Sequence, residues 1–291
     1  MQANEIEERI GGYRVVRTML NGQNSAVLEV VQEGTGRRFA MKQLLHSRSG
    51  ERSERKAFEF EAKLGMLLQH PNLIRVHDLV RDPQQPYFVM DFFPNSYHLR
   101  LPLGRPREYP LPKHQLHRII RQAAVGIAFM HDKGWVHRDI KPENILVNKV
   151  GEVRVIDYAL AMKVRTGLAK VFGGKPPRAG THSYMSPEQI RCEPPLPTSD
   201  IYSFGITCYE LACGRQPFRA NSLNELLNKH VRERPSPPTV HNKLITPEYS
   251  DLVMRMIAKK PADRPATMHE FQSLFARVRI FQDDPDPQEG R

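Results

Sequence analysis

The first ninety residues are organised as short apolar runs separated by polar, glycine-containing turns. Five runs have this character: "YRVVRTML" (13–20), "SAVLEVVQ" (25–32), "RRFAMKQLL" (37–45), "LIRVHDLV" (73–80) and "PYFVMDFF" (86–93). Short β-prone segments bounded by turn residues are typical of antiparallel strands. One segment differs, because in "ERKAFEFEAKLGMLLQH" (54–70) the residues Phe60, Leu64 and Leu67 recur at helical spacing. The pattern therefore predicts a small, mostly β half with a single helix.

Beyond residue 112 the apolar period changes from that of strands to that of helices. Five segments are predicted to be helical: 113–134, 198–214, 221–231, 247–260 and 267–279. Several of them open on Ser, Thr or Asn, or carry an early proline, which are helix-start signals. The proline-rich stretch "LPLGRPREYPLP" (101–112) predicts a loop, and "QDDPDPQEGR" (282–291) predicts a disordered polar end.

These patterns predict four parts along the chain. They are an N-terminal extension (1–12), a smaller lobe (13–94), a larger lobe (95–278) and a polar tail (279–291). The fold class expected from them is α+β, with mainly β structure in the smaller lobe and mainly α structure in the larger one.

Composition excludes several classes of protein. The 291 residues are 40% hydrophobic and 26% charged, which suits a globular chain, and no stretch approaches the roughly 18 apolar residues of a membrane span. Three cysteines and an N-terminus without an apolar signal region predict a cytoplasmic location. The net charge of +11 raises the possibility of a nucleic-acid-binding module, but no long Lys/Arg block or aromatic-basic repeat accompanies it. No nucleic acid is expected as a partner.

The most specific chemical signal is "VHRDIKPENILV" (136–147). It places Asp139, Lys141 and Asn144 on one short loop before an apolar strand, and Asp157 follows at the end of the next strand. Mg²⁺-assisted phosphoryl transfer needs a carboxylate near the substrate hydroxyl and a cation beside it. It also needs oxygen ligands for the metal, here an amide and a second carboxylate.

These residues give the chain a resemblance to the eukaryotic-type (Hanks-type) Ser/Thr protein kinases, in particular to bacterial members. The resemblance runs from about Tyr13 to Val278 and implies a bilobal kinase fold that uses ATP with Mg²⁺, or Mn²⁺ in its place. "HRDIKPEN" is similar to the catalytic loop, with Asp139 as base, Lys141 beside the γ-phosphate and Asn144 as a metal ligand. "IDYA" is similar to the D-F-G motif, with Asp157 as the main metal ligand.

The resemblance also implies the residues that bind the nucleotide. "FAMK" supplies Lys42 for the phosphates, and counting back nine residues from His70 of "HPN" gives Glu61 as its partner. The remaining nucleotide contacts would come from four places. They are the phosphate loop at Gly22, the gatekeeper Met90, the hinge backbone at Asp91 and Phe93, and the apolar walls formed by Val27, Ala40 and Leu146.

Two further pairings and a substrate class follow from the same resemblance. Glu188 of "YMSPEQ" is expected to pair with Arg264, and Asp200 to hold the catalytic-loop backbone. Lys141, together with "GT" at Gly180 and Thr181, resembles Ser/Thr rather than Tyr kinases. Small-molecule kinases of related fold usually have Gly where Arg138 stands, so the resemblance implies a protein substrate. The chain itself is another candidate substrate, at Thr166 within a basic run, and the resemblance implies Arg138 as the partner of a phosphate there. The sequence leaves the oligomeric state open.

Four departures from the family pattern keep a second interpretation open. Of the three phosphate-loop glycines only Gly22 is present, with Leu20 and Ser25 at the other two positions, and Tyr158 and Ala159 replace the family's Phe and Gly. A catalytically weak or inactive kinase-fold scaffold, or pseudokinase, is the alternative function. An active enzyme is favoured because Lys42, Glu61, Asp139, Asn144 and Asp157 are all present.

Overall fold

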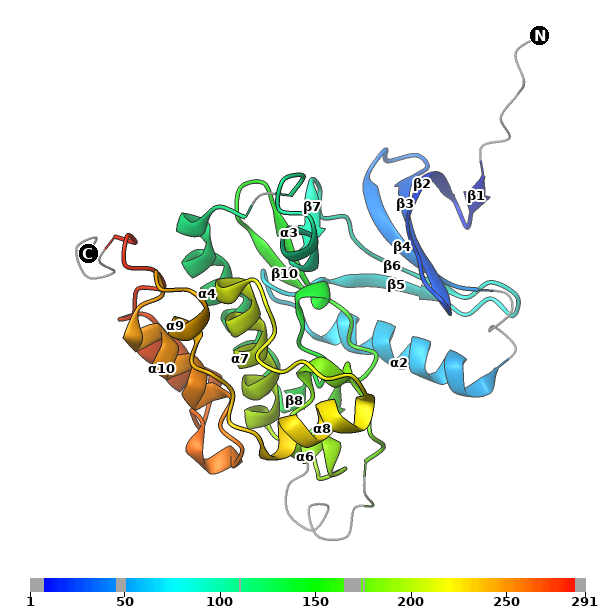
Figure 1. The fold of residues 1–291 in the computed structure, drawn as a ribbon. Helices are drawn as coiled ribbons and strands as arrows, with labels where there is room; N and C mark the ends of the chain where they lie inside the picture. The colour runs from blue at the N-terminus through cyan, green and yellow to red at the C-terminus, as the bar shows by residue number, and fades with distance from the viewer. Residues whose placement is uncertain (1–7, 46–50, 110, 165–173, 175, 286–291) are drawn as a thin grey trace. The chain divides into compact units, whose positions relative to one another are not determined.

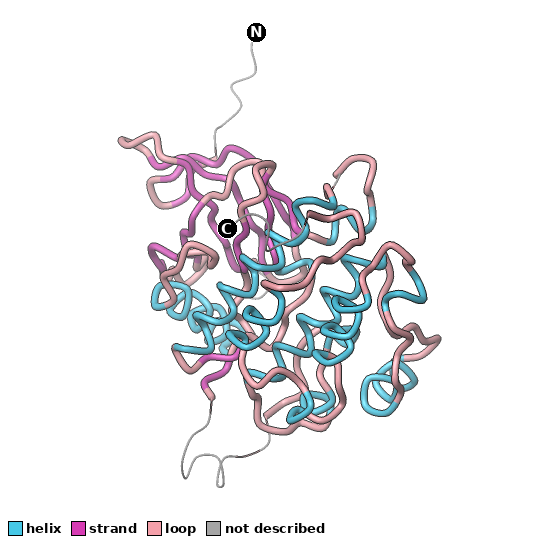
Figure 2. Tube along the Cα trace, turned by 90° about the vertical axis from the view of Figure 1, so that its left-hand side faces the viewer, coloured by secondary structure: helices cyan, strands magenta, loops and turns pink. Residues whose placement is uncertain are grey.

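The computed structural model describes residues 8–45, 51–109, 111–164, 174 and 176–285. The chain divides into two compact units, Met1–Asn95 and Ser96–Arg291 (Figure 1). Strands make up most of the regular structure in the first unit and helices most of it in the second (Figure 2). The α+β class expected from the apolar pattern is confirmed.

In the described part of the first unit, six strands form one antiparallel sheet with the order β1-β2-β3-β4-β6-β5. Their bounds are β1 Arg9–Ile10, β2 Tyr13–Asn21, β3 Ser25–Gln32, β4 Arg38–Leu44, β5 Val76–Val80 and β6 Tyr87–Asp91. The five predicted strands are confirmed, with β5 starting three residues later than its apolar run. β1 was not predicted, because two residues are too short to show an alternating pattern.

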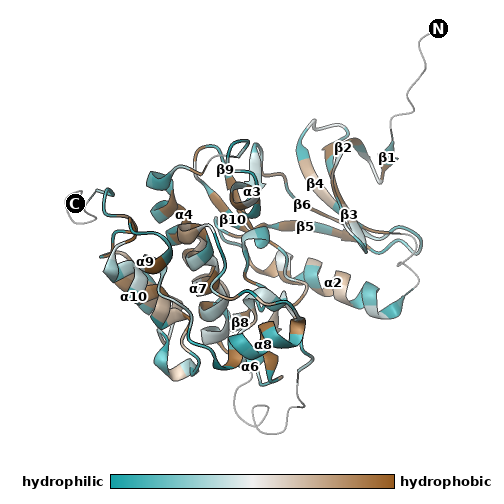
Figure 3. Ribbon diagram, viewed as in Figure 1, coloured by the Kyte–Doolittle hydropathy of each residue, from teal (hydrophilic) through white to brown (hydrophobic). Residues whose placement is uncertain are grey.

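Among the described residues of this unit, α2 (Arg52–Leu67) is the helix, and it presents an apolar stripe to the sheet. Figure 3 shows polar and apolar bands alternating along it, as expected for a helix with one buried face. Phe58 and Ala62 on that stripe pack with Val76 of β5 and Phe88 of β6. The Phe58 and Phe88 rings lie 4.9 Å apart, so the buried face of α2 is fixed against β5 and β6.

The second unit is mainly helical, with short strands beside its loops. Its helices are α3 Arg100–Gly104, α4 Lys113–Asp132, α6 Pro187–Ile190, α7 Pro197–Cys213, α8 Leu223–Arg232, α9 Pro238–His241, α10 Pro247–Met256 and α11 Met268–Phe275, with 3₁₀ turns η1 Pro142–Asn144, η2 His182–Tyr184 and η3 Pro261–Asp263. Its strands are β7 Ser96–His98, β8 Trp135–Val136, β9 Ile145–Asn148, β10 Val153–Val155 and β11 Met162–Lys163. Within the described residues, no helix has both the length and the apolar character required to cross a bilayer.

The core of the second unit is built around α7. Almost every residue of this helix is buried, and α4, α10 and α11 contact it. Gly205 of α7 packs tightly against α10, since a Cβ atom there would lie 2.7 Å from Cβ of Met256. Only glycine permits this approach, because any side chain at residue 205 would clash with those of Met256 and Ile257.

One sequence-based prediction about this unit was wrong. Residues 101–104 belong to α3 and not to the loop predicted over 101–112. Pro102 does not prevent the helix, because it lies in the first turn, where the proline nitrogen would have no intrahelical acceptor in any case.

A buried ion pair joins α6 to the turn after η3, as the family resemblance implied. Nη1 and Nη2 of Arg264 lie 2.7 and 3.0 Å from the two carboxylate oxygens of Glu188, and Arg264 is 1% exposed. Burial raises the pKa of Glu188, but hydrogen bonds and charge from Arg264 lower it further, so that the net pKa lies below its ordinary value. Glu188 is therefore ionised in the folded protein.

Removing the cation from this pair should be strongly destabilising. Arg264→Ala leaves a buried carboxylate without its counter-ion, and we expect a loss of about 3–5 kcal/mol in the free energy of unfolding at neutral pH. Urea unfolding followed by fluorescence of the single tryptophan, Trp135, measures this in the second unit. Because the folded pKa of Glu188 is lowered, the contribution is present above the ordinary Glu pKa of about 4.3 and is lost as the pH falls below it.

The exposed pair between Arg255 and Glu270 provides the matched control. Its N–O distance of 2.6 Å is as short, but the two side chains are 43% and 36% exposed. Arg255→Ala should therefore cost less than about 1 kcal/mol. Equal losses in the two variants would contradict the importance of burial at Arg264.

Candidate active site

Lys42 and Glu61, predicted as partners, are paired in the first unit. Nζ of Lys42 lies 2.7 and 2.8 Å from the two carboxylate oxygens of Glu61. Lys42 comes from β4, and Glu61 comes from the buried face of α2 with 6% of its surface exposed. The packing of α2 on the sheet therefore fixes where the ammonium group lies.

Residues predicted to surround the nucleotide share one face of the same sheet. Val27 is the cross-strand partner of Lys42, and Met90 is the cross-strand partner of Ala40. Ala40 and Lys42 are two residues apart on β4, so their side chains point to the same side. The register thus gathers Val27, Ala40, Lys42 and Met90 on one surface. On this surface the apolar side chains of Val27, Ala40 and Met90 lie next to the ammonium group of Lys42.

The remaining predicted contacts lie at the end of β6, just after it, and on β9. The amide of Asp91 donates to the carbonyl of Arg75 at 2.9 Å, so Asp91 could bind a base only through its carbonyl. Phe93 follows two residues later and is buried at 8% exposure. Leu146 belongs to the second unit, on β9 opposite Arg154.

The turn that contains Gly22 explains why one glycine of the phosphate loop is present. The amide of Gly22 donates to the carbonyl of Ser25 at 2.9 Å, and a Cβ atom on residue 22 would lie 2.9 Å from that same oxygen. Glycine is therefore required by the tight turn itself. Leu20 is 60% exposed at the end of β2, so its side chain adds no packing to the turn.

In the second unit, the catalytic-loop residues converge on the Asp139 carboxylate, which is 8% exposed. Its Oδ1 accepts the amide of Thr181 at 2.7 Å, and its Oδ2 lies 2.7 Å from Nζ of Lys141. Nδ2 of Asn144 also donates to Oδ2, at 3.1 Å. Lys141 in turn donates to the hydroxyl of Thr181 at 2.6 Å.

This network sets the protonation state of Asp139. Burial raises its pKa, but the charge and hydrogen bond of Lys141 and the hydrogen bonds of Thr181 together lower it below the ordinary value. The group would take up a proton only at a pH below about 3.9, the usual Asp pKa. At neutral pH it is a carboxylate, able to accept a hydrogen bond from a hydroxyl group.

Asn144 and Asp157 are brought together by the backbone. The amide of Ile156 donates to the carbonyl of Asn144 at 3.0 Å, which places Asp157 beside the loop. Because Nδ2 of Asn144 is bound to Asp139, its side-chain oxygen is the atom left to bind a ligand. One amide oxygen and one carboxylate are hard oxygen donors, and such a small set fits Mg²⁺, which keeps several waters and phosphate oxygens as ligands.

The backbone of this region is strained at two informative positions. Arg138 and Asp157 both have φ of 69°, and within the described residues only two other non-glycine residues, Asn95 and Cys192, have positive φ. Such conformations cost roughly 1–3 kcal/mol and cluster at functional sites. The amides of His137 and Arg138 donate to Asp200 at 2.7 and 2.8 Å, so the predicted role of Asp200 in holding this loop is confirmed.

Comparison with known proteins agrees with this arrangement. Residues 13–276 match the protein kinase domain. The chain belongs to the protein kinase family. It is similar to the serine/threonine-protein kinase pkn3 of Myxococcus xanthus, with 31% identity over 96% of this chain and 53% of that protein. It is also similar to the serine/threonine-protein kinase PknA of Mycobacterium tuberculosis, with 31% identity over 95% of this chain and 63% of that protein. The kinase chain thus spans between about one half and two thirds of the length of these relatives.

The two replaced residues of the D-F-G motif fit this kinase without strain. Tyr158 is 1% exposed, contacts the His137 ring edge-on at 6.2 Å between centroids, and donates its hydroxyl to the carbonyl of Val155 at 3.4 Å. Ala159 has a negative φ, and its amide donates to Oδ1 of Asp157 at 3.2 Å. The conformation seen here therefore does not need glycine at residue 159.

Two contacts of the second unit were not predicted from the sequence, and one predicted site lies outside the described residues. His131 contacts Oδ2 of Asp200 at 2.9 Å, and the hydroxyl of Tyr184 donates to Glu210 at 2.5 Å. Neither contact has a sequence signal, since each joins residues from separate segments of the chain. Thr166, the predicted modification site, lies outside the described residues. Arg138, its proposed partner, donates to the carbonyls of Leu160 and Pro177 at 3.4 and 3.0 Å.

Proposed function

We propose that the chain is an ATP-dependent serine/threonine protein kinase with Asp139 as its base. The observation that supports this best is the Asp139 carboxylate, which is buried, ionised and held by Thr181, Lys141 and Asn144. A substrate hydroxyl that donates to this carboxylate has its oxygen aimed for in-line attack. The relatives named as serine/threonine kinases support the same reaction and a protein substrate.

The transfer step assigns a role to each residue of the network. The hydroxyl oxygen of Ser or Thr forms a bond to the γ-phosphorus, the bond to the β,γ-bridging oxygen breaks, and the hydroxyl proton passes to Asp139. Lys141 lies 2.7 Å from the same carboxylate, so its ammonium group is placed to balance negative charge on the transferring phosphoryl group. Thr181 fixes the carboxylate through its amide.

ATP and Mg²⁺ would be bound by the residues already described. Lys42, held by Glu61, would bind the α- and β-phosphates, and the apolar face of the sheet would contact the base. Asn144 and Asp157 would hold Mg²⁺ (or Mn²⁺), which when bound neutralises charge on the phosphates. Gly22 closes the loop that follows β2 and would lie over the phosphates.

Incubation with γ-labelled ATP tests this function. We expect label on Ser and Thr of a mixed protein acceptor when Mg²⁺ or Mn²⁺ is present, and loss of labelling when EDTA removes the metal, because the phosphate charge is then unbalanced. Phosphoamino-acid analysis identifies the acceptor. A protein that transfers no label under saturating ATP with either metal would overturn the proposal.

A further inference from the structure

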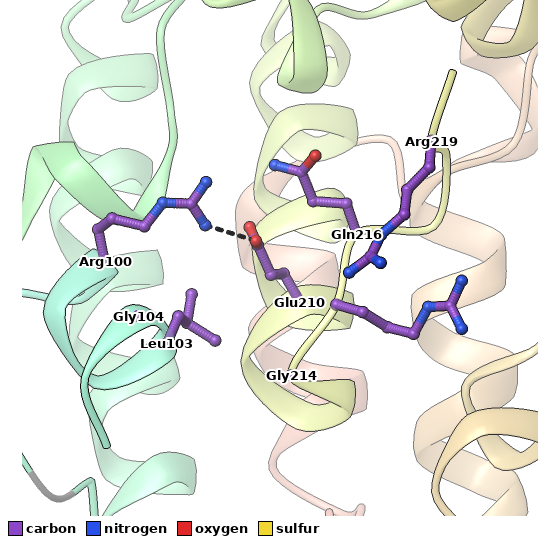
Figure 4. Close-up of a pocket in the computed structure, with 8 residues that line it drawn as sticks. Arg100, Leu103, Gly104, Glu210, Gly214, Gln216 and Arg219 are labelled. Atoms are coloured by element: carbon purple, nitrogen blue, oxygen red, sulfur yellow. Dashed lines mark hydrogen bonds and ion pairs between the residues drawn. The ribbon is translucent and has the colours of Figure 1, made fainter. Parts of the chain in front are cut away.

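Four glutamates in the described part of the chain are buried. Three of them are bound by a basic residue, in the pairs Glu61 with Lys42, Glu188 with Arg264 and Glu210 with Arg100. Figure 4 shows the last pair, with Arg100 facing Glu210 in a pocket of the second unit. The fourth is Glu29 on β3, which is 0% exposed and matches no motif in the sequence.

Glu29 is bound by one arginine from each neighbouring strand. Nε of Arg17 on β2 lies 2.8 Å from Oε2 of Glu29, and Nη2 of Arg38 on β4 contacts Oε1. The side chains of Arg17 and Arg38 are 64% and 53% exposed, so the carboxylate is covered by two guanidinium groups that reach solvent. Charge-assisted hydrogen bonds of this kind fix the position of each guanidinium group.

This group of charges lies on the face of the sheet that was assigned to the base. Glu29 is the cross-strand partner of both Arg17 and Ala40. Glu29 is two residues from Val27 on β3, and Arg38 is two residues from Ala40 on β4, so each pair of side chains points to the same side. The ion pairs therefore stand directly beside the apolar surface of Val27 and Ala40.

Arg38 connects these ion pairs to the hinge. Its guanidinium carbon lies 4.6 Å from the centroid of the Phe92 ring, which is a cation–π contact. Phe92 stands between Asp91 and Phe93, the two residues whose backbone is expected to bind the base. Both peptide units that join Asp91 to Phe93 contain atoms of Phe92, so its two backbone dihedrals set how these groups are aimed.

Asp91, on the other side of Phe92, is already held by β5 and the residue before it. Its amide donates to the carbonyl of Arg75 at 2.9 Å, and its Oδ1 lies 2.6 Å from Nε2 of His77. Because these contacts fix Asp91, the direction of the hinge beyond it depends on how Phe92 is held.

We propose that Glu29 and Arg38 are positioning residues for ATP, which fix the hinge backbone through the Phe92 ring and thereby strengthen binding of the adenine base. A hinge that is ordered before ATP arrives loses less conformational entropy on binding. This matters in a chain with only one of the three phosphate-loop glycines, because the base then supplies a larger share of the affinity. The inference rests on the proposed kinase function, since it assigns a determinant of ATP binding to that same site.

Calorimetric titration of the full 291-residue chain with ATP and Mg²⁺ compares Arg38→Gln with Arg17→Gln. Both variants lose one partner of Glu29 and one half-exposed charge, but only Arg38 contacts Phe92. We expect the Kd for ATP to rise about three- to fivefold in Arg38→Gln, the effect of one cation–π contact, with kcat for the mixed protein acceptor unchanged. In Arg17→Gln the Kd should stay within about 1.5-fold of the parent. Equal affinities in the two variants would overturn the proposal.

A nucleotide analogue and a double variant separate positioning from a structural role. Purine riboside triphosphate lacks the amino group that would donate to the carbonyl of Asp91, so the preference for ATP over this analogue should fall in Arg38→Gln and be retained in Arg38→Lys. Arg38→Gln/Phe92→Leu should bind ATP no more weakly than Phe92→Leu alone, because the two residues act through one contact. If Arg38 only stabilises the sheet, urea unfolding followed by circular dichroism will show lower stability with an unchanged preference, and the proposal falls.

The same measurements distinguish this proposal from the proposed function. ATP binding that depends on Arg38, in a chain that transfers no phosphate, would support the hinge role and overturn the kinase activity. Transfer with equal ATP affinity in Arg38→Gln and Arg17→Gln would support the activity and overturn the hinge role. Phe92→Leu removes the ring and keeps both ion pairs of Glu29, so it tests the same contact if Arg38→Gln fails to fold, and an unchanged Kd there would also overturn the hinge role.

Discussion

Asp139→Asn should lower kcat for peptide phosphorylation by about 10²- to 10⁴-fold, with little change in the KM for ATP. The new amide cannot take up the hydroxyl proton. In addition, its nitrogen replaces one of the two oxygens that receive hydrogen bonds from Thr181, Lys141 and Asn144. Steady-state kinetics with labelled ATP, at saturating Mg²⁺, measure the loss.

Asp132→Asn is the matched control for this change. Asp132 lies at the end of α4, where its carboxylate contacts His269 at 3.0 Å with both side chains more than half exposed. The same carboxylate-to-amide change there should leave kcat within about twofold, since exposed pairs contribute little. Trp135 fluorescence checks that both proteins are folded. If Asp139→Asn retains full kcat, another residue accepts the proton and the proposed mechanism is wrong.

The strands and helices with clear periodicity could be predicted from the sequence, and the short elements could not. α2 and β2 each have enough residues to show their period, and the predicted segments overlap them closely. β7, three residues long, and α3, with Pro102 inside it, have no such signal. Their formation depends on contacts with other segments, as in the pairing of β7 with β9, which a local pattern does not contain.

The candidate site shows the same division between local and non-local information. Asp139, Lys141 and Asn144 lie within six residues, so their convergence is a property of one loop and the motif reveals it. The contact of Thr181 with Asp139 joins residues 42 positions apart, and only the folded chain shows it.

The structure also changes how the Tyr158 and Ala159 substitutions are interpreted. Glycine at residue 159 would matter if the backbone there had to adopt positive φ, and it does not. The positive φ belongs instead to Asp157, whose carboxylate receives the amide of Ala159. The alanine is therefore compatible with a metal-binding orientation of Asp157. Nothing in the described residues favours an inactive scaffold.

Asp157→Ala and Ala159→Gly should accordingly have opposite outcomes, although they lie two residues apart. Asp157→Ala removes an oxygen ligand, and we expect loss of Mg²⁺-dependent ATP binding and of nearly all phosphate transfer. Ala159→Gly keeps the ligand and its hydrogen bond from the amide of residue 159. It should lower stability by about 0.4–1 kcal/mol through the more flexible unfolded chain, with kcat within about threefold of the parent. Calorimetric ATP titrations with Mg²⁺ or EDTA, together with peptide kinetics, separate the two effects. A silent parent in which Ala159→Gly switches transfer on would show that the alanine locks Asp157 in an inactive conformation, and the present interpretation of this motif would be wrong.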